Sequence, residues 1–339
     1  MNPTGRLQTD PNRVTSLVTS FYGSATLFAA AELGVFAELA HLRKSSAVEI
    51  AATLKLDLRS TTLLLDACVA LGLLEKDGGF YRNSLDAETY LVPGRPFDLS
   101  TLIRVSRQVY PLWTELPEFV RTGMPVDRGD DDKEKDSELL TAQLLSQHVR
   151  TLAIGRPVIR RLDLQGRKRL LEVGAGPGTY SVLISLEFPQ LHCTILDRPE
   201  VIKIASALIS QQGSSQHVSA LAGDYLSAPF PPGNDVVLMF GFLHREAKEQ
   251  IPVLIRRAAE SLNPGGVLYV MEVMTDETHT MPSFSALYAL NVALTRPTGH
   301  IFSHAELQGW MEQAGLRDFS VEMLPPPVPH WLAHAHKAL

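Results

Sequence analysis

The sequence contains only two cysteines in 339 residues, Cys68 and Cys193, and both lie inside apolar stretches. This scarcity excludes a disulfide framework and indicates buried, reduced thiols in a cytosolic protein. The first residues include Arg6, Asp10 and Arg13 and lack the basic-then-apolar pattern of a secretory signal. These absences together predict a cytoplasmic protein.

An excess of positive charge is also missing. The chain has 31 basic and 37 acidic residues, for a formal net charge of −6. Proteins that bind nucleic acid usually carry a basic surface, so no nucleic-acid partner is expected. The most apolar N-terminal stretch, residues 16–40, is interrupted by Glu32, Glu38, glycines and hydroxyl groups. We therefore expect no membrane-spanning helix and no membrane partner.

The length exceeds that of a usual single domain, so we expect a smaller accessory domain at 1–100 and a larger one at 101–339. Apolar and small residues recur at helical spacing over residues 14–39, which predicts helices that approach a partner closely in a dimer. Two short helices at 46–53 and 59–71, followed by a strand and hairpin, have the order of a winged helix.

A winged helix can bind DNA, but the second of these helices offers mainly leucines and Arg59 as its one cation. A DNA reader needs exposed basic or amide side chains, so the structural interpretation is favoured. The acid-rich run at 128–138 is interpreted as a solvated surface loop. Helical periodicity resumes over 139–162.

From about residue 165 the pattern changes to short apolar strands that alternate with helical segments. Such alternation predicts a mostly parallel, Rossmann-like α/β sheet with helices on both faces. Ligands of such sheets bind at the carboxyl ends of the strands. The expected strands include 169–173, 192–196, 236–240 and 266–271.

A glycine turn follows the first of these strands, in the segment Leu171-Glu-Val-Gly-Ala-Gly-Pro-Gly-Thr-Tyr. It lets a ligand approach bare backbone at the start of a helix. Gly174, Gly176 and Gly178 alternate strictly, whereas a dinucleotide fingerprint spaces its glycines differently, and Pro177 removes one amide. A nicotinamide cofactor is therefore disfavoured.

Acidic residues follow the next two strands. Asp197 lies nineteen residues after Gly178, where a carboxylate can accept hydrogen bonds from a ribose diol. After the third strand, Asp224 is suited to an adenine amine and Tyr225 offers an aromatic face. Taken singly, the turn can simply pack a helix on a strand, and either aspartate can be a helix cap. Their ordered coincidence predicts an adenosine-containing ligand.

These motifs resemble those of class I S-adenosylmethionine-dependent methyltransferases, and more narrowly the plant-type O-methyltransferases and their bacterial relatives. The resemblance covers nearly the whole chain and implies a seven-stranded sheet with a final antiparallel strand, S-adenosylmethionine as cofactor, and a homodimer built on the N-terminal winged-helix region. The motifs are Val173-Gly-Ala-Gly-Pro-Gly, Leu196-Asp-Arg-Pro, Gly223-Asp-Tyr, Leu243-His and Leu262-Asn-Pro-Gly-Gly. By position, the implied cofactor-binding residues are Gly174, Gly176, Asp197, Arg198, Gly223, Asp224, Tyr225 and Phe240.

Methyl transfer to a phenol is easier once the phenol has lost its proton, so a base is expected near the methyl group. His244 follows an apolar strand and occupies the position of the family's catalytic base. Glu272 lies 28 residues later and matches the acidic partner that orients this base. Without the resemblance, a histidine after a strand is also compatible with a capping or packed residue.

The sequence departs from the family pattern at several positions. Relatives commonly continue His-Asp-Trp, whereas this chain has Arg245 and Glu246 after His244. Phe240 stands where many plant members have lysine. Ile301 stands where the family has a second acidic residue beside the histidine. The acceptor is expected to be a small phenolic or aromatic hydroxyl compound. Carbon or nitrogen methylation by proximity, a repurposed relative without methyl transfer, and a ligand-sensing regulator are the alternatives.

The acceptor pocket is expected to combine apolar faces with a few polar tips, although these residues are equally compatible with core positions. The candidates are Tyr110, Trp113, His148, Tyr288 and Asn291. His330, His334 and His336 share parity on the expected last strand, which raises the question of a zinc site. No cysteine or carboxylate accompanies them nearby, so an ordinary strand face is expected and no metal.

Overall fold

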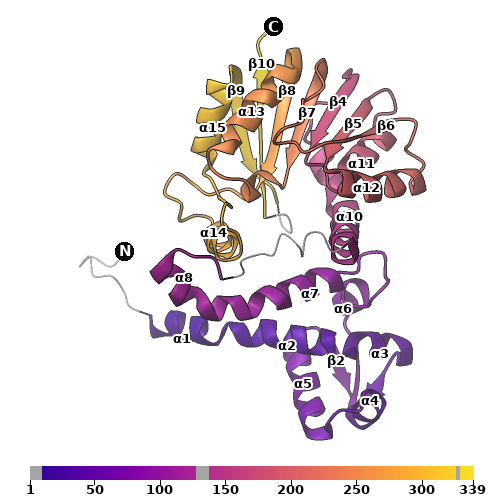
Figure 1. Ribbon diagram of the computed structural model, residues 1–339. Coiled ribbons are helices and arrows are strands. Elements are labelled where there is room, and N and C mark those ends of the chain that lie inside the picture. The colour runs from indigo at the N-terminus through magenta and orange to yellow at the C-terminus, as the bar shows by residue number, and fades with distance from the viewer. Residues whose placement is uncertain (1–9, 127–136, 326–328) are drawn as a thin grey trace, which may run out of the picture. The chain divides into compact units, whose positions relative to one another are not determined.

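The computed structural model describes residues 10–126, 137–325 and 329–339, and Figure 1 shows their arrangement. The chain divides into two compact units, Met1–Gln108 and Val109–Leu339. The sequence placed this division at residue 100. The acid-rich run expected as a surface loop lies outside the described residues, apart from its last two positions, which begin a helix.

The first unit joins a set of helices to a small antiparallel sheet with the order β1-β3-β2. Its strands are β1 (Ser45–Ser46), β2 (Leu74–Asp77) and β3 (Phe80–Asn83). Its helices are α1 (Pro11–Thr19), α2 (Phe21–Glu32), α3 (Val35–Leu42), α4 (Ala47–Leu54), α5 (Leu58–Ala70), α6 (Leu85–Tyr90) and α7 (Ser100–Val109), which runs to the unit's edge. Ser46 and Glu49 form a capping box on α4, and the Asp57 side chain caps α5.

The N-terminal helices expose an apolar surface. The stretch Pro11–Glu32 is long and apolar enough to cross a membrane by length and composition alone, with a mean hydropathy of 1.3, and this leaves the expectation of no membrane-spanning helix a prediction. Core helices and signal sequences pass the same test. Ala30 differs from this surface because it is fully buried in the unit's own core, beside Phe36 and Leu65.

The second unit is a seven-stranded sheet with the order β6-β5-β4-β7-β8-β10-β9. Strands β4 to β8 pair in parallel, and β10 is antiparallel to both of its neighbours, which confirms the predicted sheet with a final antiparallel strand. The strands are β4 (Arg169–Val173), β5 (His192–Asp197), β6 (Val218–Ala222), β7 (Asn234–Phe240), β8 (Leu262–Glu272), β9 (Leu316–Met323) and β10 (Trp331–Lys337).

Helices cover both faces of this sheet (Figure 1). Side chains of β4 alternate between the faces, so Leu170 packs with residues of α10 to α12 and Leu171 packs with residues of α13 and α15. The unit's helices are η1 (Tyr110–Glu115), α8 (Leu116–Thr122), α10 (Ser137–Ile159), α11 (Thr179–Glu187), α12 (Pro199–Gln211), η2 (Leu243–Arg245), α13 (Gln250–Ser261), α14 (Ser283–Thr295) and α15 (His304–Gln313).

Candidate active site

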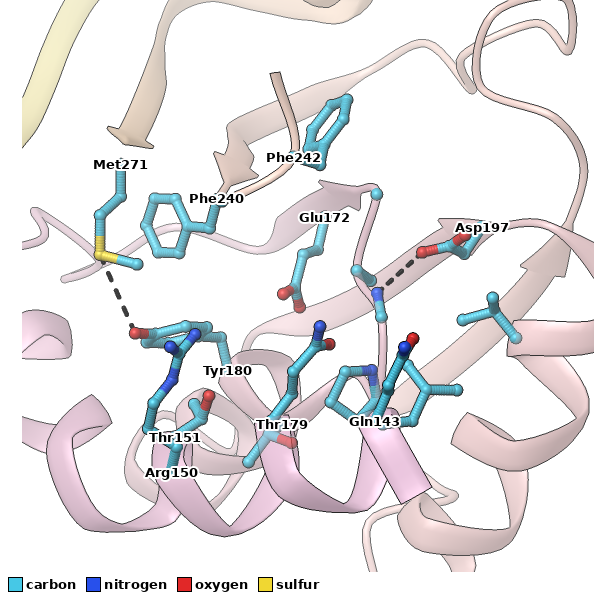
Figure 2. A pocket seen from close by; sticks show the side chains of 18 of the residues that line it. Gln143, Arg150, Thr151, Glu172, Thr179, Tyr180, Asp197, Phe240, Phe242 and Met271 are labelled. Atoms are coloured by element: carbon cyan, nitrogen blue, oxygen red, sulfur yellow. Dashed lines mark hydrogen bonds between the residues drawn. The ribbon is translucent and has the colours of Figure 1, made fainter. Parts of the chain in front are cut away.

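A cavity opens at the carboxyl ends of β4, β5, β7 and β8, with α10 as one of its walls (Figure 2). The turn between β4 and α11 forms its floor, and Gly174 and Gly176 there have φ values of +62° and +54°. A Cβ atom on Gly174 would lie 2.5 Å from the Phe242 ring. Only glycine satisfies both the backbone conformation and the space at this position.

Asp197 ends β5 and its carboxylate is buried in the cavity wall. Its Oδ2 accepts a hydrogen bond from the Gly176 N–H at 2.8 Å, and its Oδ1 accepts one from the Arg198 N–H at 2.8 Å. Burial raises the pKa of Asp197, and these two hydrogen bonds oppose the shift. The carboxylate thus fixes the glycine turn and keeps lone pairs for a ligand.

Gly223 and Asp224 lie just outside the cavity lining, although the sequence predicted them as cofactor residues. The exposed Asp224 side chain accepts a hydrogen bond from the Leu226 N–H at 2.9 Å and so caps its own turn. A Cβ atom on Gly223 would lie 2.8 Å from the Ala228 Cβ, so local packing accounts for this glycine. These local contacts account for both residues within the chain, and their role toward the cofactor stays a prediction.

Tyr225 does line the cavity, together with Arg198 and Arg245. Its hydroxyl donates a hydrogen bond to Glu246 Oε1 at 2.7 Å, and its ring packs against Phe242 with centroids 4.7 Å apart. Glu246, which replaces the tryptophan common in relatives, therefore anchors a tyrosine ring at this end of the cavity.

Two charged residues that the sequence analysis did not single out, Glu172 and Arg150, also line the cavity. Glu172 is 2% exposed, and burial raises its pKa to about 7 although Ser181 donates hydrogen bonds from its N–H and hydroxyl to Glu172 Oε2. Arg150 extends from α10 toward Tyr180, and within the described residues it has no ion-pair partner (Figure 2). A carboxylate and a free guanidinium at one site suit a zwitterionic amino-acid group.

Phe240 forms an apolar part of the cavity wall beside Tyr180 and Met271. Its ring packs edge-on against Tyr180 with centroids 5.0 Å apart, and the Tyr180 hydroxyl lies 3.9 Å from the Met271 sulfur. Figure 2 shows the three side chains facing one another.

His244 and Glu272 are brought together beside the cavity. His244 lies in η2 after β7, and its Nδ1 is 2.9 Å from Oε2 of Glu272, which ends β8 and whose side chain is 0% exposed. The other ring nitrogen, Nε2, lies 3.5 Å from the Tyr288 hydroxyl. The buried carboxylate therefore fixes the ring and turns Nε2 toward the Tyr288 hydroxyl.

The remaining predicted acceptor residues occupy different surroundings. Trp113 Nε1 donates a hydrogen bond to Asn291 Oδ1 at 3.1 Å, so η1 and α14 are joined. His148 is buried on α10 with its Nδ1 2.8 Å from the Thr179 hydroxyl, and Thr179 rather than His148 lines the cavity. Tyr110 is 36% exposed on η1.

His330 differs from the other two C-terminal histidines. It precedes β10 and lines the cavity, whereas His334 and His336 lie within the strand. Burial lowers its pKa to about 4, and the charges of Arg150 and His244 act in the same direction, opposed by Glu272. His330 thus lies close to the His244–Glu272 pair.

The geometry agrees with the family comparisons. A model of the O-methyltransferase domain matches residues 121–317, and one of the O-methyltransferase dimerisation domain matches residues 15–93. The chain belongs to the O-methyltransferase family. It is an enzyme with S-adenosylmethionine as its cofactor.

Individual relatives match most of the length of this methyltransferase. The 3-hydroxy-5-methyl-1-naphthoate 3-O-methyltransferase of Streptomyces sahachiroi is 31% identical over 90% of this chain and 89% of its own length. The N,N-dimethyltransferase OxyT of Streptomyces rimosus is 30% identical over 95% of each chain. The crystal structure of human N-acetylserotonin methyltransferase in complex with SAM has a TM-score of 0.84 at 26% identity, covering 99% of this chain and 100% of that one.

The residues that the sequence analysis missed carried weak signals. Glu172 is a charged residue inside an otherwise apolar strand, which is an anomaly that points to function. Gln143, Gln147 and Arg150 follow one another by four and three residues and so share one face of α10, but a polar helix face is usually solvated. These side chains form a cavity wall because α10 packs over the edge of the sheet. The sequence pattern does not indicate this packing.

Proposed function

We propose that the protein transfers a methyl group from S-adenosylmethionine to a phenolic hydroxyl of a small aromatic acceptor, with His244 as general base and Glu272 as its orienting partner. The observation that carries this proposal is the 2.9 Å contact between His244 Nδ1 and a carboxylate that is 0% exposed. The buried acceptor of the Nδ1 proton selects the tautomer with a free Nε2 lone pair.

The cavity residues fit the cofactor. The strained glycine turn admits a group close to the backbone, and Asp197 is placed to accept hydrogen bonds from the ribose. Glu172 and Arg150 are placed for the ammonium and carboxylate of the methionine end. Tyr225 offers its ring at the adenine end. When bound, this cofactor supplies an electrophilic sulfonium methyl group.

In the proposed reaction, His244 Nε2 accepts the proton of the acceptor hydroxyl as the new carbon–oxygen bond forms and the sulfur–methyl bond breaks, with S-adenosylhomocysteine as the leaving group. The Nδ1–H donates to Glu272 throughout, so the imidazolium that develops is stabilised by a carboxylate. The Tyr288 hydroxyl, 3.5 Å from Nε2, marks the side on which the acceptor oxygen binds. Trp113 and Asn291 are proposed as further contacts of the acceptor. Tyr110 and His148 are proposed to lie at the margins of the acceptor site.

A fused-ring aromatic acceptor is favoured because the relative from Streptomyces sahachiroi is named for a hydroxynaphthoate. Nitrogen methylation is the second candidate, because OxyT, of similar identity, is named as an N,N-dimethyltransferase. The dimerisation-domain match supports a homodimer.

Incubation of the purified protein with labelled S-adenosylmethionine and paired naphthols and naphthylamines tests this proposal. We expect methyl ethers of the naphthols, identified by mass spectrometry, and much slower reaction of the amines. Transfer only to the amines, or to ring carbon, would replace the oxygen assignment.

A further inference from the structure

His330 is placed by the strand register beside the residues proposed for catalysis. Trp331, the next residue, pairs directly with Glu272 across β10 and β8. The His330 carbonyl accepts a hydrogen bond from the Leu324 N–H at 2.9 Å, which fixes the backbone. The side chain lines the same cavity as Phe240, Met271 and Arg150.

The imidazole of His330 has an unused hydrogen-bonding atom. Its Nδ1 is buried and has no hydrogen-bond partner among the described residues. A buried polar atom without a partner is costly, so such an atom in a cavity wall points to a ligand that completes it. Most other polar groups of this wall, such as those of Asp197 and Tyr180, already have partners in the protein.

The ring remains neutral under ordinary conditions. Burial lowers the pKa of His330 to about 4, and of the groups that face it Arg150 and His244 lower it further while Glu272 raises it. A neutral imidazole has one N–H and one lone pair, so it can donate to a carbonyl or accept from a hydroxyl. It would not attract a cation.

We propose that His330 binds a second oxygen of the acceptor, a hydroxyl or carbonyl group adjacent to the hydroxyl that is methylated. This inference rests on the proposed function, because it takes His244 as the site of the reacting oxygen. His244 follows β7 and His330 precedes β10, the two strands that flank β8 and its last residue Glu272, so the two imidazoles would contact two oxygens that lie close together on the acceptor ring. The acceptor class is therefore an ortho- or peri-dioxygenated aromatic compound.

The test compares naphthalene-2,3-diol with 2-naphthol, which differ by one adjacent hydroxyl. Calorimetry with protein loaded with S-adenosylhomocysteine measures binding of each. We expect the wild type to bind the diol roughly tenfold more tightly, as for one gained hydrogen bond. His330→Phe should bring the ratio close to one by weakening the diol alone, while the affinity for S-adenosylhomocysteine is unchanged.

Two further variants separate the hydrogen bond from shape. His330→Asn places an amide near the position of Nδ1 and should retain part of the preference for the diol over 2-naphthol. This variant also provides the test if His330→Phe does not fold. Phe240→Leu alters the apolar wall of the same cavity and exchanges one side chain that cannot hydrogen-bond for another, so it should change both affinities by similar factors.

Equal binding of the two compounds by the wild type, or binding of neither, would overturn the inference. An equal loss of affinity for the diol and for 2-naphthol in His330→Phe would also overturn it. Weaker binding of S-adenosylhomocysteine by His330→Phe would overturn it as well, because that result would place His330 against the cofactor. Turnover is measured separately. A protein that binds the diol through His330 but yields no methyl ether would keep this inference and reject the proposed reaction.

Discussion

The contact between His244 and a carboxylate that is 0% exposed is the residue-scale feature on which the proposed reaction depends. General bases contribute about a hundredfold to ten-thousandfold to rate, so His244→Gln should lower kcat by that order and leave cofactor affinity nearly unchanged. Turnover should recover partly at higher pH or with more acidic phenols, because an ionised acceptor needs no base. Steady-state kinetics and calorimetry measure both quantities.

Glu272→Gln is the matched variant for this prediction. It disturbs the orientation of the base without removing the imidazole, so it should show a smaller loss in the same direction. The competing mechanism is proximity alone, in which an already ionised or carbon nucleophile is held in line with the methyl group. Near-normal turnover of His244→Gln at neutral pH on the true acceptor would favour that mechanism and leave His244 as a wall residue.

Glu172 predicts a pH-dependent stability. Burial raises its pKa to about 7 in the folded protein, above its ordinary value of 4.5, so the folded state binds more protons between these values. The contribution of this group to the free energy of unfolding is therefore present at low pH and is lost as pH rises through about 7. The loss amounts to as much as about 3 kcal/mol. Glu172→Gln should raise the Tm of the ligand-free protein more at pH 8 than at pH 5.

The control for Glu172 is Glu187→Gln, an exposed position on the same helix that Glu172 contacts through Ser181. It should shift Tm little and equally at both pH values. A Glu172→Gln shift of the same size at pH 5 and pH 8 would show that the carboxyl group does not titrate in this window. Burial also raises the pKa of the neighbouring Asp197. Asp197 therefore contributes a decrease of stability with rising pH that remains in Glu172→Gln.

At the scale of elements, the alternation of apolar strands and helices predicted the sheet and the edge where ligands bind. Strand ends are local in sequence, and parallel pairing of β7 with β8 brings His244 and Glu272 together although 28 residues separate them. The strands predicted at 169–173 and 192–196 correspond to β4 and β5, the latter one residue longer. This part of the site follows from pattern and topology.

Other elements depend on contacts that no periodicity encodes. The polar face of α10 becomes a cavity wall only because the helix packs over the sheet edge, so Arg150 resembles a solvated cation in the sequence. His330 shares parity with His334, but β10 begins at Trp331 and leaves His330 beyond the strand, facing the cavity. At the end of β6, Asp224 accepts a hydrogen bond from the Leu226 N–H within its own turn, a contact that the strand and helix pattern does not indicate.

For the whole molecule, the N-terminal helices predict a homodimer. Val14, Leu17, Val18, Phe21 and Tyr22 recur at intervals of three and four residues and so form one face of α1 and the start of α2. Their side chains are between 49% and 68% exposed in the single chain. A stripe of this kind requires a covering partner, and the dimerisation-domain match over residues 15–93 favours a second copy.

The variant for this stripe is Leu17→Lys, since Leu17 is 68% exposed and makes no contribution to the unit's own core. Ala30→Lys would be a poor choice, because Ala30 is fully buried within its unit and the change would unfold it. Leu17→Lys should convert a dimer at micromolar concentration into a monomer by light scattering, with circular dichroism unchanged. Val48→Lys, at an isolated exposed position on α4, should leave the dimer intact. A monomeric wild type that floats with lipid vesicles would instead assign the apolar stripe of Pro11–Glu32 to a membrane surface.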